Sequence, residues 1–214
     1  MKKLLILALL IASVTFIFAA ESEFSDVVGY VKYELTANDY NMIALPMNTG
    51  ITNASELAVA ISPNVTAVSI WNNETHNWKQ YTVSEVGTDF EINPSDALLI
   101  YLDGTANVDF YCAGSLPTQA NYDLVANDYN SMMLPLNRSE ITTTTEFATA
   151  IGGGVTAIST WDNETHGWKQ YVVSEVGTAF EINIGDGFLI FSNEAYEGWN
   201  APAGRTMNRT AVRK

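Results

Sequence analysis

The 214-residue chain contains one cysteine, two histidines and only ten lysines and arginines. So few cysteines and histidines leave almost nothing for a thiol catalyst, a structural zinc site or a histidine-based triad. Because 24 Asp and Glu residues give a formal charge of −14, nucleic-acid binding through a basic face is excluded. The sequence therefore predicts a protein that is not an enzyme and that needs no metal or other cofactor.

Charged residues make up only 16% of the chain, whereas 47% of the residues are apolar. This composition supplies a packed core and excludes disorder throughout the chain. Cys112 has no partner for an intramolecular disulfide, and we expect a buried thiol rather than an intermolecular bridge. A secreted hydrolase is disfavoured because no nucleophile, base and orienting group can be named together.

Residues 1–20 have the features of a secretory signal peptide. The pair Lys2-Lys3 precedes an apolar run over residues 4–18, and two alanines form a small-residue cleavage site. A membrane anchor is the alternative, but an apolar run of about 15 residues is short for a bilayer span. We expect the mature chain to be secreted, extracellular or on the cell surface, without a transmembrane span.

The two ends of the mature chain have opposite charge. Of its eight basic residues, half lie in the last ten positions: Arg205, Arg209, Arg213 and Lys214. The first residues after the signal are acidic: Glu21, Glu23 and Asp26. These seven residues are the candidates for contacts between copies of the chain.

An internal duplication organises the sequence. The segment 37–48 recurs at 126–137, and the segment 71–88 recurs at 161–178. About 40 of 63 aligned positions are identical at an offset of 89 or 90. The predicted organisation is a signal peptide, two copies of one domain, and a basic tail or partial strand: 1–20, 21–112, 113–203 and 204–214.

Each copy is expected to be mainly β. Short apolar and β-branched runs alternate with Asn, Gly, Pro and Asp clusters, as is typical of a sandwich or barrel. In the first copy these runs are 42–45, 65–71, 78–83 and 97–102, with a polar hairpin loop at 72–77. The predicted fold is all-β, with two separately packed, tandem β-sandwich-like domains that meet near residues 113–118.

One short helix interrupts the strands of each copy. Asn53-x-x-Glu56 and Thr143-x-x-Glu146 have the capping-box pattern, and each precedes an apolar stretch, at 57–61 and 147–151. The triple glycine at 152–154 is a strong stop signal after the second helix. We therefore expect one short helix in each domain.

The motif order in both copies resembles a repeat of exported prokaryotic surface proteins of the surface-layer, sheath or extracellular-fibre type. The shared order is Tyr-Asn-x-x-x-Leu-Pro, a capped helix, Val-Thr-Ala-x-Ser-x-Trp, a Trp-Lys-Gln-Tyr strand and a final Phe-x-Ile-x-x-Gly-Asp-Gly turn. The tail lies outside the resemblance, and the first copy departs from it at 94–97, where Pro-Ser-Asp-Ala replaces the glycines. The resemblance implies a role in a surface or extracellular assembly.

The duplicated Asn-Glu-Thr-His loop is a candidate metal site. It contains Glu74 and His76 in one copy and Glu164 and His166 in the other. One histidine and one carboxylate are too few ligands, so a polar hairpin turn is favoured. Calcium in the acidic turns remains open, but their spacing matches no EF-hand loop. We therefore expect the acidic residues to form a solvated surface.

Six Asn-x-Ser/Thr sequons make the exported chain a candidate for covalent glycosylation. They begin at Asn53, Asn64, Asn73, Asn137, Asn163 and Asn208. The abundance of Asn and Thr in this sequence is the alternative explanation. Because a polar connection between two apolar strands belongs at the surface, we expect Asn73 and Asn163 to be exposed on equivalent hairpin loops.

Five tryptophans supply either core volume or a platform on which sugars stack. They are Trp71, Trp78, Trp161, Trp168 and Trp199. Core packing is favoured, because a duplicated Trp pair beside a hairpin fills a β-sandwich naturally. The platform remains the basis of a rival function, that of a secreted carbohydrate-binding or adhesive module.

The leading interpretation is a non-enzymatic structural subunit of a filament, sheath or surface layer, whose partners are copies of itself. Near residue 203 the chain begins a sequence like the start of the second repeat and then stops. A lone strand needs a partner edge, which strand addition to a neighbour supplies. With oppositely charged ends, this predicts head-to-tail association through the terminal segments.

Overall fold

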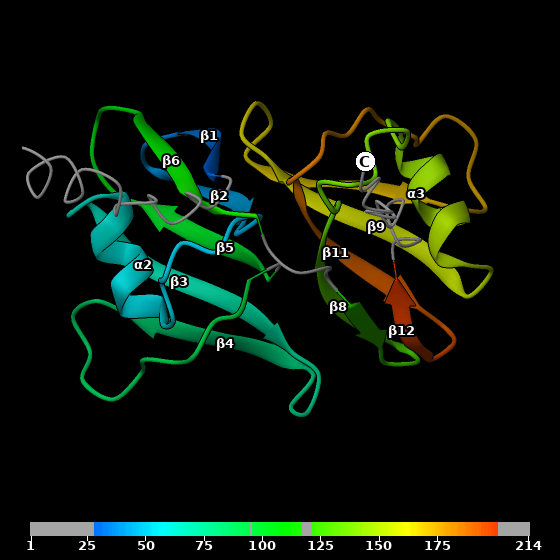
Figure 1. Cartoon of the computed structure of the whole chain (residues 1–214), viewed down its shortest axis with the longest axis horizontal. Helices are drawn as coiled ribbons and strands as arrows, with labels where there is room; N and C mark the ends of the chain where they lie inside the picture. Colours follow the sequence, from blue (N-terminus) through cyan, green and yellow to red (C-terminus); the bar gives the residue numbers. More distant parts are fainter. Residues whose placement is uncertain (1–27, 95, 117–120, 201–214) are drawn as a thin grey trace, which may run out of the picture.

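The computed structural model of the chain describes residues 28–94, 96–116 and 121–200 (Figure 1). Several predictions fall outside these residues. They concern the signal peptide, the sequon at Asn208 and the seven assembly candidates Glu21, Glu23, Asp26, Arg205, Arg209, Arg213 and Lys214.

The first half of the described chain forms one four-stranded antiparallel sheet, a two-stranded ribbon and one helix. The sheet has the order β2-β5-β3-β4, and the ribbon pairs β1 with β6. The elements are β1 (Val28–Leu35), β2 (Asp39–Ala44), α2 (Ala54–Ile61), β3 (Val65–Asn72), β4 (Asn77–Thr82), β5 (Ala97–Leu102) and β6 (Val108–Ser115).

The second half repeats this arrangement. Its sheet has the order β8-β11-β9-β10, and β7 pairs with β12 in a ribbon. The elements are β7 (Asn121–Leu124), β8 (Asp128–Met133), α3 (Thr144–Ile151), β9 (Val155–Asp162), β10 (Gly167–Val172), β11 (Gly187–Ser192) and β12 (Tyr196–Asn200). The chain is mostly β with several antiparallel sheets, as expected; the predicted division between residues 112 and 113 falls inside β6.

Both helices begin where the capping patterns predict. The side chain of Asn53 accepts the backbone N–H of Glu56 at 2.9 Å. Thr143 and Glu146 complete a reciprocal capping box at the start of α3. A side-chain oxygen at these positions satisfies helix N–H groups that have no partner within the helix.

Each half has its own hydrophobic cluster on one face of its four-stranded sheet. In β5, for example, Leu98, Ile100 and Leu102 are fully buried in the first cluster. Helix α2 packs on β3 and α3 packs on β9, and the two helices lie at opposite outer sides of the molecule (Figure 1). The predicted buried thiol is confirmed, since Cys112 is a free cysteine inside the first cluster. Whether either half folds alone stays a prediction.

The opposite faces of the two sheets pack against each other. Because strand side chains alternate between faces, Ala97 and Leu99 of β5 point away from their own cluster. Strand β2 contacts β9 and β11, while β8 contacts β3 and β5. Ala44 even belongs to the hydrophobic cluster of the second half. The halves therefore share a broad interface, which is much more than the junction expected near 113–118.

Candidate functional site

The two Asn-Glu-Thr-His segments form equivalent hairpin turns, as predicted. In the β3–β4 turn, the Asn72 side chain accepts the N–H groups of Glu74 and Thr75 at 2.8 and 3.3 Å. His76 then takes a left-handed conformation with φ of 49°. In the β9–β10 turn His166 has φ of 51°. Both histidines therefore project from the same place on the two turns.

The hairpin of the first half docks on Asp128 of the second half. This carboxylate, at the start of β8, accepts hydrogen bonds from Trp71 Nε1 at 3.0 Å and Asn73 Nδ2 at 3.0 Å. The Nδ1 atom of His76 lies 2.9 Å from the same carboxylate. A fourth bond comes from the backbone N–H of Tyr129 at 2.8 Å. The Asp128 residue is only 3% exposed, so the first hairpin closes over it.

The hairpin of the second half docks on Asp39 in the same way. Trp161 Nε1, Asn163 Nδ2 and His166 Nδ1 lie 3.1, 3.0 and 2.8 Å from the Asp39 carboxylate. The backbone N–H of Tyr40 donates to it at 2.8 Å. The two halves therefore hold each other through two reciprocal contacts, which we call the aspartate locks and which centre on Asp39 and Asp128.

The turn before β2 places Asp39 for this contact. Asn38 adopts φ of 55°, a left-handed conformation that Asn tolerates better than most residues. The side chain of Asn41 accepts the N–H of Thr36 at 2.7 Å and donates to its carbonyl at 3.1 Å. The Ala-Asn-Asp-Tyr-Asn motif is thus a turn, held by its two asparagines, that presents the aspartate between them.

Burial and hydrogen bonding shift the pKa of both aspartates in opposite directions. Burial alone raises the pKa of the Asp39 carboxyl, but the bonds from Asn163, His166, Tyr40 and Trp161 outweigh it and lower the pKa. The pKa of Asp128 is lowered by the equivalent balance. Both side chains are therefore held as carboxylates, the form that accepts four donors at once.

The locks correct two predictions. Asp39 and Asp128 are buried, so these two acidic residues do not belong to a solvated surface. Asn73 and Asn163 are half-buried rather than exposed, and the Nδ2 atom of each donates both to an aspartate and to a backbone carbonyl of the other half. In the sequence, the signal for this contact between the halves is the identical Asn-Glu-Thr-His segment at 73–76 and 163–166. The geometry of a hairpin turn alone does not require these residues.

Four of the five candidate tryptophans form a continuous row between the halves. Trp71 pairs with Trp78 across its hairpin, and Trp161 pairs with Trp168 across the other. Both pairs are edge-to-face, with centroids 5.7 and 5.6 Å apart. Trp78 and Trp168 stack at 6.1 Å and 22° in the middle of the row. The row explains the duplication of both tryptophan pairs.

Trp199 is separate from this row. It is 8% exposed and belongs to the second hydrophobic cluster. Its Nε1 atom donates to the carbonyl of Ala150 at 2.9 Å, and the Arg138 guanidinium lies 5.8 Å from its ring centroid. For Trp199 the structure places the ring in the core, as favoured from the sequence.

A cleft of about 310 Å³, which we call the aromatic cleft, opens beside the tryptophan row. Its floor is a row across the second sheet, in which Leu189 and Gln170 both lie opposite Ser159. The aromatic lining comes from both halves of the molecule: Trp71, Trp78, Tyr129 and Trp168. This cleft combines aromatic rings, of which Trp168 is exposed and the others are half-buried, with the amide of Gln170 and the hydroxyl of Ser159.

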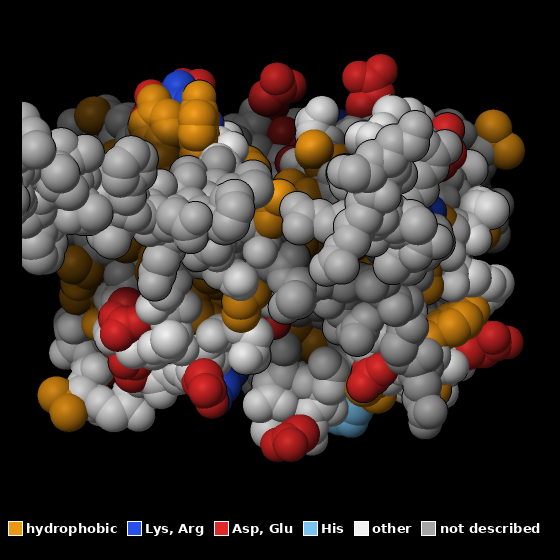
Figure 2. Space-filling model, viewed as in Figure 1, with side chains coloured by type: hydrophobic (Ala, Val, Ile, Leu, Met, Phe, Trp, Pro, Cys, Tyr) orange, Lys and Arg blue, Asp and Glu red, His pale blue; other side chains and the backbone are white. Residues whose placement is uncertain are grey.

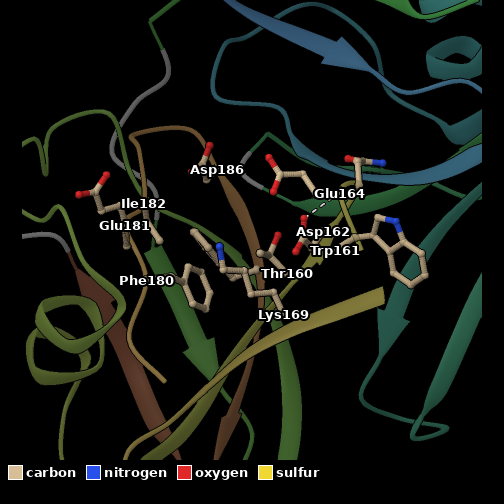
Figure 3. Close-up of a pocket in the computed structure, with 11 residues that line it drawn as sticks. Thr160, Trp161, Asp162, Glu164, Lys169, Phe180, Glu181, Ile182 and Asp186 are labelled. Carbon is tan, nitrogen blue, oxygen red and sulfur yellow. Dashed lines mark hydrogen bonds between the residues drawn. The ribbon is translucent and has the colours of Figure 1, made fainter. Parts of the chain in front are cut away.

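A second cleft, of about 370 Å³, lies on the other side of the β9–β10 hairpin (Figure 3). The Lys169 ammonium lies 4.9 Å from the centroid of the Phe180 ring. Asp162 accepts the N–H of Glu164 at 3.0 Å, and burial raises the pKa of Asp186. Within the described ranges no group of three or more His, Cys, Asp or Glu side chains is placed to hold a metal ion.

The remaining sequons have different surroundings. Asn53 is the N-cap of α2, and its Oδ1 atom accepts hydrogen bonds from Glu56 and Ser55. Asn64 and Asn137 are exposed. Asn64 and Asn137 are therefore the described sequons that the fold leaves accessible.

Comparison with known proteins gives no relative: no family model, no curated protein and no solved structure matches the chain. In the described part of the chain, no helix is long and apolar enough to cross a membrane.

Proposed function

We propose that this chain is a non-enzymatic, exported structural subunit of an extracellular filament, sheath or surface layer. In this proposal the two halves are tandem β-sandwich-like domains of one duplication. Copies of the mature chain associate head to tail, with the basic C-terminal segment of one copy against the acidic body of the next.

The charge distribution carries the proposal. Residues 28–200 contain 21 Asp and Glu but only four Lys and Arg, and acidic side chains are spread over the visible face (Figure 2). Bodies of such charge repel one another at low ionic strength. Close packing of copies therefore needs positive charge from elsewhere, and residues 205–214 contain four basic side chains.

The basic residues of the described body already have partners. Lys32 pairs with Asp109 at 2.8 Å, and Arg138 pairs with Glu140. The ammonium groups of Lys79 and Lys169 lie over the rings of Phe90 and Phe180, at 5.2 and 4.9 Å from their centroids. The C-terminal segment, with four basic side chains in ten residues, is therefore the densest source of positive charge for a contact between copies.

Two further features support a role as a structural subunit. The aspartate locks fasten the halves together through six side-chain contacts to two carboxylates, which suits a subunit that transmits force. Strands β4 and β10 are the outer strands of their sheets, so each offers an edge for strand addition. A heterologous contact of this kind that does not close produces an open filament.

The experiment compares the mature chain with a variant truncated after Pro202, by sedimentation velocity and negative-stain electron microscopy. We expect polymers from the mature chain and folded monomers from the truncated one. Polymers that persist after truncation would overturn the head-to-tail mechanism. A mature chain that stays monomeric over a wide concentration range would overturn the assembly role itself.

A matched variant separates charge from strand addition. It keeps the full length but replaces Arg205, Arg209, Arg213 and Lys214 with glutamine. If charge holds the contact, this variant stays monomeric, and polymers of the mature chain dissociate as salt rises and the screening length falls below about 10 Å. If backbone pairing holds the contact, the variant still polymerises whereas the truncated chain does not.

A further inference from the structure

The aromatic cleft has a floor and a wall of different chemistry. The floor residues Leu189, Ser159 and Gln170 come from three neighbouring strands, so their spacing is fixed by the sheet. Trp71 and Trp78 reach the cleft from the hairpin of the other half. The Asp128 lock fixes that hairpin through the Trp71 Nε1 bond at 3.0 Å. The cleft is thus built on rigid elements on both sides.

The rings in the cleft leave aromatic surface open to solvent. Trp168 is 43% exposed although it stacks on Trp78. The planes of Trp71 and Trp78 are at 90° to each other, so they present a ring face and a ring edge. The negatively polarised face of an aromatic ring attracts C–H groups, and a sugar ring has C–H groups along its apolar face.

Polar groups stand next to these rings. The Gln170 amide nitrogen donates to Ser159 Oγ at 3.1 Å, which orients the amide and leaves its second N–H and its carbonyl oxygen for other bonds. A ring surface with a few fixed polar groups is the usual composition of a small-molecule site. Hydroxyl groups at the edge of a sugar ring match an amide that both donates and accepts.

Size and charge narrow the ligand class. A cleft of about 310 Å³ lies at the lower end of the range for ligand pockets, which suits one or two sugar rings. The four lining side chains other than Trp71, Trp78 and Trp168 are Tyr129, Ser159, Gln170 and Leu189, so the lining has no charged side chain. The acidic body repels anionic polysaccharides. We propose that the aromatic cleft binds a neutral mono- or disaccharide unit of an extracellular polysaccharide.

The test is titration of the mature protein with three neutral oligosaccharides, cellohexaose, chitohexaose and mannohexaose, followed by calorimetry and tryptophan fluorescence. We expect at least one of them to bind with Kd below about 10 mM, equivalent to roughly −3 kcal/mol. The variants Trp168→Ala and Gln170→Ala should each weaken that binding by about tenfold or more. No binding by any of the three sugars would overturn the proposal.

Two controls make the result specific. Trp199→Phe changes a tryptophan of the core that does not line the cleft, so sugar affinity should be unchanged. Gln170→Ala removes an exposed side chain and its bond to Ser159 but leaves the hydrophobic clusters intact, so it tests the site even if Trp168→Ala fails to fold. Unchanged affinity in Gln170→Ala and in a folded Trp168→Ala would place the sugar elsewhere and overturn the proposal. Binding of a neutral sugar is also insensitive to salt, unlike a charge-held polymer contact.

Discussion

Asp39 Oδ2 and His166 Nδ1 lie 2.8 Å apart although 127 residues separate them in the chain. The second lock repeats the contact between Asp128 and His76 at 2.9 Å. In both locks the aspartate is buried, whereas the histidine side chain is 67% exposed. The buried aspartate therefore holds the hairpin, and the histidine covers it at the solvent side.

Removing the aspartate should cost much more than removing the histidine. Asp39→Ala leaves Trp161 Nε1 without its acceptor and removes one of the two acceptors of Asn163 Nδ2. We expect a loss of about 3 kcal/mol in the free energy of unfolding. His166→Ala removes an exposed partner and should cost less than about 1 kcal/mol. Urea denaturation of the two variants measures both values.

The exposed Glu85→Ala substitution is the control and should change stability by less than about 0.5 kcal/mol. If Asp39→Ala were as mild as this control, the lock would contribute nothing to holding the halves together. The corresponding substitution Asp128→Ala should behave like Asp39→Ala, because its partners are equivalent.

The locks also make stability depend on pH. The pKa values of Asp39 and Asp128 are lowered in the folded chain. Their contribution to the stability of the folded chain is therefore fully present above about pH 3.9, the pKa of an aspartate in the unfolded chain. It is lost as the pH falls below that value and through the lower pKa of the folded chain. We expect thermal unfolding temperatures to fall steeply below about pH 4, and Asp39→Asn to flatten this fall.

The pKa of Asp186 is shifted in the opposite direction to those of Asp39 and Asp128. Burial raises its pKa, so its contribution is present below the unfolded pKa and is lost as the pH rises through the folded pKa. Its Oδ2 atom accepts the N–H of Asn183 at 2.8 Å, a bond that an asparagine carbonyl can replace. Asp186→Asn should therefore stabilise the protein at neutral pH and leave unchanged the fall of the unfolding temperature below about pH 4. Identical pH profiles for the Asp39→Asn and Asp186→Asn variants would contradict both assignments.

The local elements could be predicted from the sequence because their causes are local. The apolar run at 65–71 is β3, and the side chains of Asn53 and Thr143 cap helices where their patterns indicate. Pairing of β1 with β6 could not be predicted in this way, because the paired Val28 and Ser115 lie far apart in the sequence. The aspartate locks have the same origin, since their donors and acceptors come from different halves.

The environment of the tryptophan row is not specified by the local sequence. Trp71 and Trp161 are equivalent positions of the duplication, and the sequence alone favours core packing for both. Their neighbours in the structure are residues of the opposite half, such as Tyr129 beside Trp71 at 5.4 Å. A pattern of period two identifies which face of a strand is apolar, but it does not say which other sheet covers that face.

Gly187 lies at a close approach of the two sheets. A Cβ atom at this position would lie 2.7 Å from the carbonyl oxygen of Ile43 in the other half, a distance at which the backbone must shift. We expect Gly187→Ala to lower the free energy of unfolding by about 1–3 kcal/mol. Chemical denaturation measures the effect.

Gly153→Ala is the matched control, because a Cβ atom there would meet nothing within 4 Å. This substitution should be close to neutral. Equal effects of the two substitutions would mean that the close approach of β11 to β2 does not constrain the chain. The first repeat has Ala97 at the equivalent position, so the two copies differ where they meet.

Glycosylation, if the native cells carry it out, should discriminate among the sequons. The Nδ2 atom of Asn73 donates to both Asp128 and the carbonyl of Tyr129. Attachment of a glycan replaces one hydrogen of that atom and places a bulky group between the halves. The folded protein should therefore be unmodified at Asn73, and at Asn163 for the same reason.

Asn64 and Asn137 are exposed, so any glycan on the described part of the chain should be found there. Peptide mapping by mass spectrometry of material from the native source measures occupancy at each site. A glycan on Asn73 or Asn163 of folded protein would contradict the locks, because the modified amide cannot make both bonds.

The substitution Asn73→Gln tests the role of this amide without glycans. It removes the sequon but displaces the amide by one methylene, so it should loosen the hairpin and lower the free energy of unfolding by about 1–2 kcal/mol. The sequon can also be removed without moving the amide by Thr75→Ala. Because the Thr75 side chain is exposed, this variant should keep the stability of the parent, which separates the role of Asn73 in the lock from its role as a sequon.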